Sequence, residues 1–225
     1  EARRLAVRSA SKSATAAPAP SAKSAAATIE PEYPPPYAAV VVDVNSRRIM
    51  HADKADELRH PASLTKVMTL YLLFEALEAE TIDLDSELTV SMHASMQERT
   101  NLDLSPGQTL TVRDAILGLV THSANDAAVV VAEALDGTES AFAPRMNLKA
   151  RALGMNQTIY CNASGLPDDA QVTTARDQAV LGIAIQQRFP EYYPYFSTQS
   201  FIWRGKRLKN HNKLLARVKG MDGIK

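Results

Sequence analysis

The chain has 225 residues, of which 45% are hydrophobic and 22% are charged. This is enough apolar material to bury one sizeable core, and one main domain is the default at this length. With 25 basic and 25 acidic residues the formal net charge is zero, which excludes a whole-protein field that would draw the chain to nucleic acid or to an anionic membrane. The single cysteine, Cys161, excludes an internal disulfide framework and a multi-cysteine metal site.

Residues 1–36 consist mostly of Ala, Ser, Lys and Pro, with almost no large apolar side chain. Such a composition cannot bury enough surface to fold, so we interpret this segment as a disordered tether and expect the folded domain to span 37–225. The chain begins with Glu1 rather than Met, which is compatible with a leader peptide before it. The longest apolar stretch, Val67–Leu77, has the length of a buried helix rather than of a membrane span.

The predicted elements alternate in type along the chain. Strand-like patterns at 37–44 and 48–51 flank a turn. Pro61 then opens a helix over 63–77 that is apolar nearly all the way round, as is typical of a buried helix. Apolar periodicity and capping residues predict further helices at 112–121, 126–135, 139–153 and 175–188. The pattern is strand-like again at 201–203 and from 207 onward. We therefore expect an α+β domain, with one antiparallel sheet assembled from both termini and helices packed against it.

Ser63 and Lys66 stand three residues apart in the first turn of the buried helix, so their side chains share a face. The helix dipole and the apolar surroundings both lower the pKa of a lysine placed there, toward that of a usable base. A neutral Lys66 could take the proton of Ser63, which would then attack a carbonyl and form an acyl-enzyme. The spacing alone decides little, because Ser9 and Lys12 share it. The structural alternative is a capping serine beside a lysine whose head reaches water.

Two further features could carry chemistry. Ser123-Ala124-Asn125 lies between two helical patterns, where a short loop can aim a hydroxyl and an amide into a cleft. Ser123 with Asp126 also fits a Ser-x-x-Asp capping box for the next helix, and taken alone this explanation is the stronger. Lys225, the last residue, follows a short apolar run and could bind a carboxylate, although most terminal lysines are only solvated.

Taken in order, Ser63-x-x-Lys66, Ser123-x-Asn125 and Lys225 resemble the three motifs of the penicillin-binding proteins and serine β-lactamases. Longer stretches resemble the D-Ala-D-Ala carboxypeptidases, which are low-molecular-mass penicillin-binding proteins of the SxxK acyltransferase superfamily. These stretches are Pro61–Lys66, Ser123–Ala127, Asn162–Pro167, Thr174–Asp177, Asn210–Leu215 and Asp222–Lys225. The resemblance covers nearly everything after Tyr37.

The resemblance implies a β-lactamase/transpeptidase-like fold and a periplasmic serine-type carboxypeptidase that removes the terminal D-Ala from peptidoglycan pentapeptides. Its partner would be a stem peptide ending in D-Ala-D-Ala; β-lactams would inhibit it covalently, and it would need no metal, cofactor or nucleic acid. Ser63 would be acylated and Lys66 would be its base. Ser123 would relay a proton to the leaving amine, Asn125 would hold the substrate backbone and Lys225 would help to bind the terminal carboxylate. Backbone N–H groups of Ser63 and of the strand after Lys225 would hold the oxyanion.

Two departures from the family pattern matter. Ala124 stands where these carboxypeptidases usually have glycine, and we expect activity to survive the extra methyl group. The third motif reads Lys-Thr-Gly in the family, and this sequence stops at Lys225.

We therefore expect the C-terminal strands to be missing, and membrane contact to be available only through that missing end or a lost leader. Residues 1–225 alone should have little activity, because losing one oxyanion donor typically costs about a hundredfold to a thousandfold in turnover. An unpaired sheet edge should also favour aggregation.

Other functions stay open. A D-Ala endopeptidase that cuts cross-links uses the same three motifs. A class A β-lactamase is disfavoured, because Ala124 replaces the aspartate of its Ser-Asp-Asn motif and neither Glu139 nor Glu191 begins a Glu-x-x-x-Asn sequence. A non-catalytic peptidoglycan-binding module, or a tethered interaction protein, is disfavoured because the serine, lysine and asparagine of the first two motifs are all present.

Overall fold

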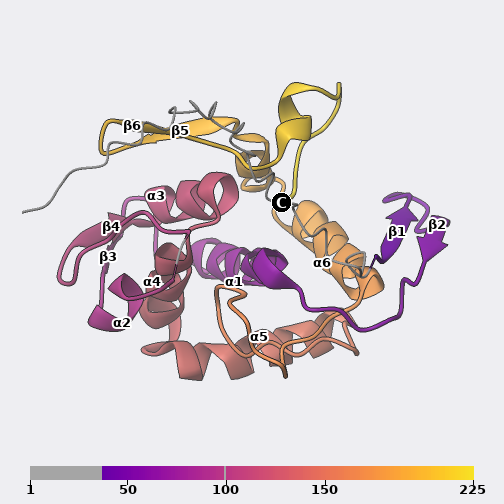
Figure 1. The fold of residues 1–225 in the computed structure, drawn as a ribbon, viewed down its shortest axis with the longest axis horizontal. Coiled ribbons are helices and arrows are strands. Elements are labelled where there is room, and N and C mark those ends of the chain that lie inside the picture. The colour runs from indigo at the N-terminus through magenta and orange to yellow at the C-terminus, as the bar shows by residue number, and fades with distance from the viewer. Residues whose placement is uncertain (1–36, 99) are drawn as a thin grey trace, which may run out of the picture. The chain divides into compact units, whose positions relative to one another are not determined.

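A computed structural model describes residues 37–98 and 100–225 (Figure 1). The helical elements, in chain order, are η1 (Ala62–Leu64), α1 (Thr65–Glu78), α2 (Met92–Ser95), α3 (Val112–Leu117), η2 (Gly118–His122), α4 (Asn125–Asp136), α5 (Glu139–Leu153), α6 (Ala175–Arg188), η3 (Tyr193–Ser197) and η4 (Lys213–Ala216). The strands are β1 (Ala39–Val42), β2 (Ile49–Asp53), β3 (Glu87–Thr89), β4 (Thr109–Thr111), β5 (Ser200–Trp203) and β6 (Lys206–Lys209). The interpretation of 1–36 as a tether lies outside the described residues and stays a prediction. Within the described part, no helix combines the length and apolarity needed to cross a membrane.

Helix α1 is the core element, as its all-round apolar pattern predicts. Every residue of α1 except Glu75 and Glu78 is buried. The helix packs against α4, α5 and α6, and Figure 1 shows it surrounded by them. Pro61, itself buried, precedes the short 3-10 turn η1 that leads into α1. The catalytic candidates Ser63 and Lys66 therefore lie at the N-terminal end of this buried helix.

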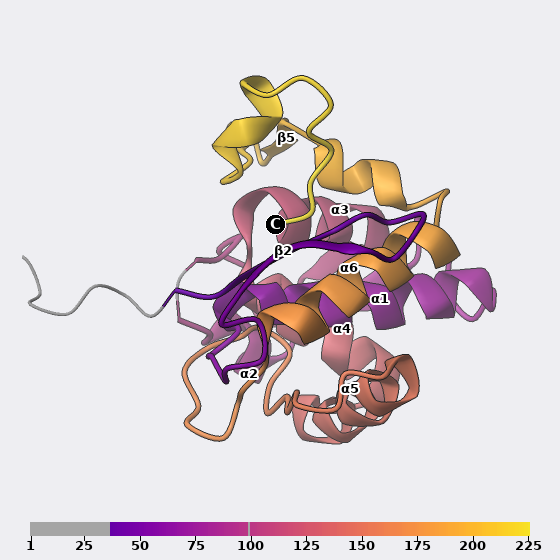
Figure 2. The ribbon, with the colours of Figure 1, turned by 90° about the vertical axis from the view of Figure 1, so that its right-hand side faces the viewer.

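The strands form three separate antiparallel pairs, β1–β2, β3–β4 and β5–β6. The predicted α+β class with antiparallel pairing is confirmed, but the expected single sheet built from both ends of the chain is not what the described strands form. The reason lies in their packing, since β1 packs against α6 (Figure 2), whereas β5 and β6 pack against η2. Different helices thus hold the first and last strand pairs, and no described strand joins them.

Helix boundaries follow the capping signals closely. α5 and α6 have the predicted bounds, because Gly154 ends α5 in the left-handed region at φ 87° and Thr174 caps α6 by accepting a hydrogen bond from the Asp177 backbone N–H at 3.1 Å. The helix predicted over 112–121 instead changes after Leu117 into the π turn η2. The short elements α2, β3, β4 and η3 were not predicted, because their sequences show no clear apolar periodicity. The strand expected from 207 onward ends at Lys209, and the 3-10 turn η4 lies in the segment after it.

Candidate functional site

The nucleophile candidate lies in a turn that aligns it with its base. Ser63 is in η1 and Lys66 in the first turn of α1, and in 3-10 geometry side chains three residues apart lie one above the other. The Lys66 Nζ is 3.4 Å from the Ser63 Oγ. Ser63 is half-buried, whereas Lys66 is 0% exposed. The alternative in which the lysine head reaches water is therefore contradicted.

The buried amine of Lys66 has three partners. It lies 2.6 Å from the Asn125 Oδ1 and 2.5 Å from the Ser164 backbone oxygen, in addition to the Ser63 Oγ. Two of these atoms can only accept a hydrogen bond, while the serine hydroxyl can also donate one. A neutral amine has two N–H groups and one lone pair, so it can donate to both acceptors and accept from Ser63. The surroundings thus suit the form of lysine that acts as a base.

Burial also favours that neutral form energetically. The pKa of Lys66 falls from 10.5 to about 7, first because burial disfavours the ammonium ion and second because the charge of Lys225 repels it. The carboxylate of Asp126 acts in the opposite direction. Desolvation outweighs this attraction, and a substantial fraction of Lys66 is consequently unprotonated at neutral pH.

A tight loop supplies the carbonyl that holds Lys66. In the loop 162–166, the Asn162 Oδ1 accepts a hydrogen bond from the Gly165 N–H at 2.7 Å, and the Ala163 oxygen accepts one from the Thr69 hydroxyl at 2.7 Å. Gly165 has φ 84°, and a Cβ there would lie 1.9 Å from the Ala62 oxygen. Only glycine permits this approach to the start of η1. The sequence contained the loop as part of a family resemblance, but gave no sign that its carbonyl binds the lysine.

Ser123 lies at the end of the π turn η2 in a left-handed conformation, φ 60° and ψ 37°. Its Oγ is buried and has no hydrogen-bond partner among the described residues. The capping-box explanation is wrong, since α4 has no side-chain cap and Asp126 instead accepts hydrogen bonds from the Leu102 and Leu104 N–H groups. A buried hydroxyl without a partner is unusual and leaves Ser123 free to interact with a substrate.

Asn125 connects Lys66 to the loop that contains Glu98 and Thr100. While its Oδ1 accepts from Lys66, its Nδ2 donates to the Glu98 oxygen at 2.8 Å and its backbone N–H donates to the Thr100 oxygen at 2.7 Å. Ala124, the departure from the family glycine, has an ordinary φ of −64° and its side chain is buried. The backbone at this position therefore does not require glycine.

Lys225 approaches the same region from the end of the chain. Its Nζ donates a hydrogen bond to the Leu119 oxygen in η2 at 2.5 Å. Burial lowers the pKa of Lys225 to about 7. The structure thus joins Ser63, Lys66 and Asn125 by direct hydrogen bonds, places Ser123 beside Asn125 in the chain, and brings Lys225 within electrostatic reach of Lys66.

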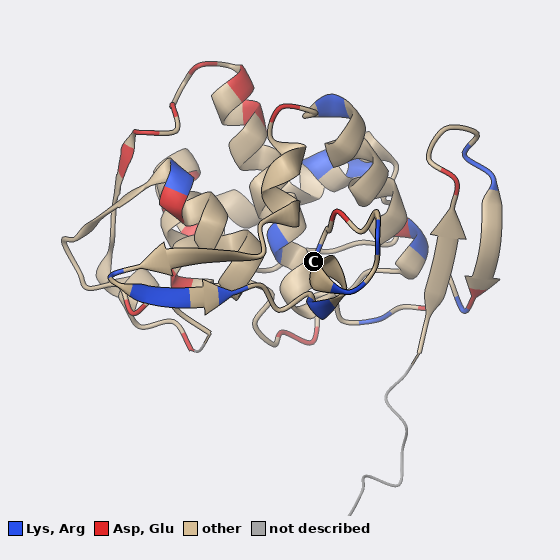
Figure 3. Cartoon of the chain, turned by 90° about the horizontal axis from the view of Figure 1, so that it is seen from above, with Lys and Arg blue, Asp and Glu red and all other residues tan. Residues whose placement is uncertain are grey.

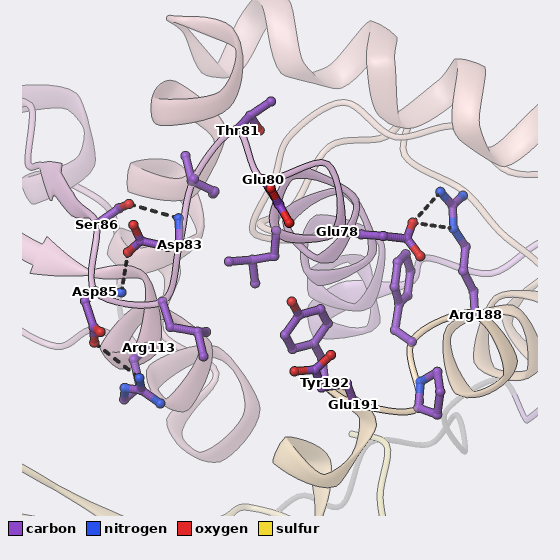
Figure 4. A pocket seen from close by; sticks show the side chains of 15 residues that line it. Glu78, Glu80, Thr81, Asp83, Asp85, Ser86, Arg113, Arg188, Glu191 and Tyr192 are labelled. Atoms are coloured by element: carbon purple, nitrogen blue, oxygen red, sulfur yellow. Dashed lines mark hydrogen bonds and ion pairs between the residues drawn. The ribbon is translucent and has the colours of Figure 1, made fainter.

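A hollow of about 980 Å³ lies elsewhere, beyond the C-terminal end of α1 (Figure 4). Figure 4 shows Arg188 paired with Glu78 and Arg113 paired with Asp85 around it. It contains none of the predicted site residues. A cavity of about 270 Å³ instead adjoins η1 and is lined in part by Ala62. Among the described residues, no three His, Cys, Asp or Glu side chains are grouped as a metal site.

Comparison with known proteins identifies relatives for most of the sequence. The D-alanyl-D-alanine carboxypeptidase DacC of Escherichia coli (strain K12) is 33% identical over 214 residues, which cover 92% of this chain and 54% of that protein. DacF of Bacillus subtilis (strain 168), also a D-alanyl-D-alanine carboxypeptidase, is 30% identical over 83% of this chain and 49% of its own length. A D-alanyl-D-alanine endopeptidase of E. coli is 33% identical over 76% of this chain and 54% of its own length. The chain thus spans about half the length of the relatives it matches.

Solved structures agree with the sequence relatives. The D-alanyl-D-alanine carboxypeptidase DacD of Francisella tularensis superimposes with a TM-score of 0.82 at 27% identity, over 88% of this chain and 60% of that one. Penicillin-binding protein D2 of Listeria monocytogenes, in its ampicillin-bound form, gives 0.71 at 32% identity, over 86% and 80%. These neighbours confirm the predicted fold type. Residues 26–225 match the D-alanyl-D-alanine carboxypeptidase family, peptidase S11, and the chain belongs to that family.

Proposed function

We propose that this protein is a serine-type D-Ala-D-Ala carboxypeptidase that removes the terminal D-Ala from peptidoglycan pentapeptides through an acyl-enzyme. The observation that carries the proposal is the buried Lys66 amine, which has a pKa of about 7 and lies within hydrogen-bond reach of Ser63. A serine beside an unprotonated amine is an activated nucleophile. Family membership supports the choice of substrate.

In the acylation step, the neutral Lys66 accepts the proton of the Ser63 hydroxyl while the Oγ attacks the carbonyl of the penultimate D-Ala. When the tetrahedral intermediate collapses, the peptide C–N bond breaks and Ser123 donates a proton to the departing amine. Ser123 regains a proton from Lys66, so the acid and base are reset. Water then attacks the ester with the same groups as base and acid, releasing the shortened peptide and free Ser63.

Two residues position the substrate in this proposal. Asn125 retains an amide hydrogen beyond the one it donates to the Glu98 oxygen, and this hydrogen is available to a substrate carbonyl. In its protonated form Lys225 has three N–H donors, of which one reaches the Leu119 oxygen, so the others can bind the terminal carboxylate of the peptide. A cation at this end of the site selects substrates that end in a free carboxyl group.

Location and inhibitors follow from the substrate. An enzyme that acts on the stem peptides of peptidoglycan works outside the cytoplasm, and we propose that this protein is periplasmic. β-Lactams would acylate Ser63 as substrate mimics, in keeping with the ampicillin complex of the Listeria relative.

A D-Ala endopeptidase acting on cross-links is the second candidate, favoured by the similarity to the E. coli endopeptidase. The two activities differ in the amine that Ser63 displaces from the D-Ala carbonyl, which is free D-Ala in one case and the amine of a cross-linked stem peptide in the other. Measuring free D-Ala release from a pentapeptide, beside cleavage of purified cross-linked dimers, separates them. Faster cleavage of dimers would replace the carboxypeptidase proposal with the endopeptidase.

The decisive experiment measures the intact mass of the full-length gene product after exposure to benzylpenicillin. One penicillin adduct is expected on the wild type and none on Ser63→Ala. Ser9→Ala is a matched control, because Ser9 has the same spacing to a lysine, Lys12, and it should retain the adduct. If the wild type gives no adduct and no penicillin turnover, the enzyme proposal is wrong and a non-catalytic binding module replaces it. Rapid turnover without an adduct would indicate a β-lactamase.

A further inference from the structure

Positive charge is concentrated near the end of the chain. Although the whole sequence is neutral, residues 192–221 contain seven Lys and Arg and no Asp or Glu. These cations are Arg204, Lys206, Arg207, Lys209, Lys213, Arg217 and Lys219. In Figure 3, blue marks the β5–β6 hairpin and the segment after it, and no red interrupts the hairpin. Because this excess of positive charge is local, the net charge of the sequence does not reveal it.

The strand register directs the charge to the outer face of the hairpin. Phe201 pairs with Leu208, and Phe201 is buried against the core, while Ile202 pairs with Arg207 and is 65% exposed. Lys209 pairs with Ser200 on the same outer face as Arg207. Because successive residues of a strand point to opposite faces, this face cannot share in the core.

A groove of about 400 Å³ lies between this outer face and η4. Its lining contains four cations, which are Arg207, Lys209, Lys213 and Arg217. All four residues are exposed, and none forms an ion pair with a described residue. Like charges around one groove repel each other, and a bound anion relieves that repulsion.

The loop that follows β6 connects the lining of the groove to the turn that precedes Ser123. His211 donates its backbone N–H to the Thr121 oxygen in η2 at 3.1 Å, and the ring of His211 lies 5.5 Å from that of His122, the residue before Ser123. The hairpin itself packs on η2. A polymer bound at Ser123 can therefore extend toward the cationic groove without leaving the surface.

We propose that this groove binds the carboxylates of neighbouring stem peptides on the same peptidoglycan polymer, as a second contact outside the acylation site. The inference rests on the proposed function, in which the substrate is a polymer that repeats its carboxylate groups. A second, weak contact on a linked ligand raises the effective concentration at the first. The groove therefore favours polymeric over small soluble substrates, and salt weakens this preference.

The test compares two matched pairs of neutralised cations in the full-length protein. Arg207→Gln/Lys213→Gln removes two charges from the groove, and Arg48→Gln/Lys54→Gln removes the same two types of charge from exposed positions near β2. Co-sedimentation with purified peptidoglycan over a series of salt concentrations is the measurement. The groove variant should bind roughly fivefold or more weakly at low salt and show a flatter salt dependence, since exposed ion pairs contribute modestly and are screened by salt. The control should bind like the wild type.

The remaining readouts separate this inference from the proposed function. Release of D-Ala from a soluble pentapeptide and benzylpenicillin acylation should be unchanged in both variants. If the wild type forms no adduct but peptidoglycan binding still depends on the groove, the proposed reaction fails and the binding site stands. Equal peptidoglycan binding by all three proteins overturns the inference. So does a groove variant that loses binding only to vesicles of anionic phospholipid, because the groove would then be a lipid site.

Discussion

At the residue scale, Lys66 controls the predicted pH dependence. Because its pKa is about 7 and the neutral form is the base, acylation of Ser63 by benzylpenicillin should rise with pH through neutrality and then level off. Lys225→Met removes a charge that lowers the pKa of Lys66, so the rising limb should move to higher pH. Stopped-flow acylation rates across neutral pH measure the midpoint. If the midpoint is unchanged in Lys225→Met, or moves to lower pH, then the charge of Lys225 does not lower the pKa of Lys66.

Gly165 offers a second test at this scale. Gly165→Ala should destabilise the protein by about 3 kcal/mol, because it combines left-handed strain with a clash against the Ala62 oxygen. Gly154→Ala is the matched control, since φ is 87° there but nothing lies within 4 Å of the added Cβ; it should cost about 1 kcal/mol. Urea denaturation measures both. Equal losses would mean that the approach to Ala62 is unimportant.

At the element scale, α1 should dominate stability. Phe74 is 0% exposed, and its ring contacts those of Phe189, Tyr192 and Phe196. Phe74→Ala should therefore lower the free energy of unfolding by about 3–5 kcal/mol. Leu148→Ala, on the exposed face of α5 at 73% exposure, should change it by less than about 0.5 kcal/mol. A loss at Leu148 as large as that at Phe74 would show that this description of the core is wrong.

The sequence predicts the elements and contacts that depend on neighbouring residues, and it misses those that depend on tertiary folding. α5 and α6 were predictable because local caps fix both of their ends, and the Ser63–Lys66 contact because it spans one helical turn. The other partners of Lys66 are 59 and 98 residues away, at Asn125 and Ser164, so only tertiary folding brings them to the amine. Ser123 was ambiguous for a related reason, since its sequence fits a capping box while the π turn before it turns the backbone away from a capping conformation.

For the described domain as a whole, the separate strand pairs predict uneven stability. Every residue of β2 is exposed, and among described strands β2 pairs only with β1, whereas α1 and α4 are buried along most of their lengths. Amide hydrogens of the β1–β2 hairpin should thus exchange with solvent much faster than those of α1 and α4. Hydrogen–deuterium exchange followed by peptide mass spectrometry measures this. Equal protection of hairpin and helices would contradict it.

The charges of the whole sequence balance, but they are unevenly distributed along it. The zero net charge of the sequence excludes a field carried by the whole protein. It does not exclude a local one, because the acids that balance the cations of 192–221 lie in other parts of the sequence. Composition averages over positions, and binding depends on where the charges are placed.

The π turn η2 has a consequence for how this region tolerates insertions and deletions. A π turn contains one residue more than the α-helical turn that it replaces. Removing one residue of Gly118–His122 would convert the π turn into an α-helical turn of the same angular extent, so α3 could continue as a regular helix up to the residue before Ser123. The left-handed backbone of Ser123 would then no longer follow a π turn, so the direction of its hydroxyl would change although no functional side chain had been substituted. The number of residues in this turn therefore matters to the proposed site as much as the hydroxyl of the serine that follows it.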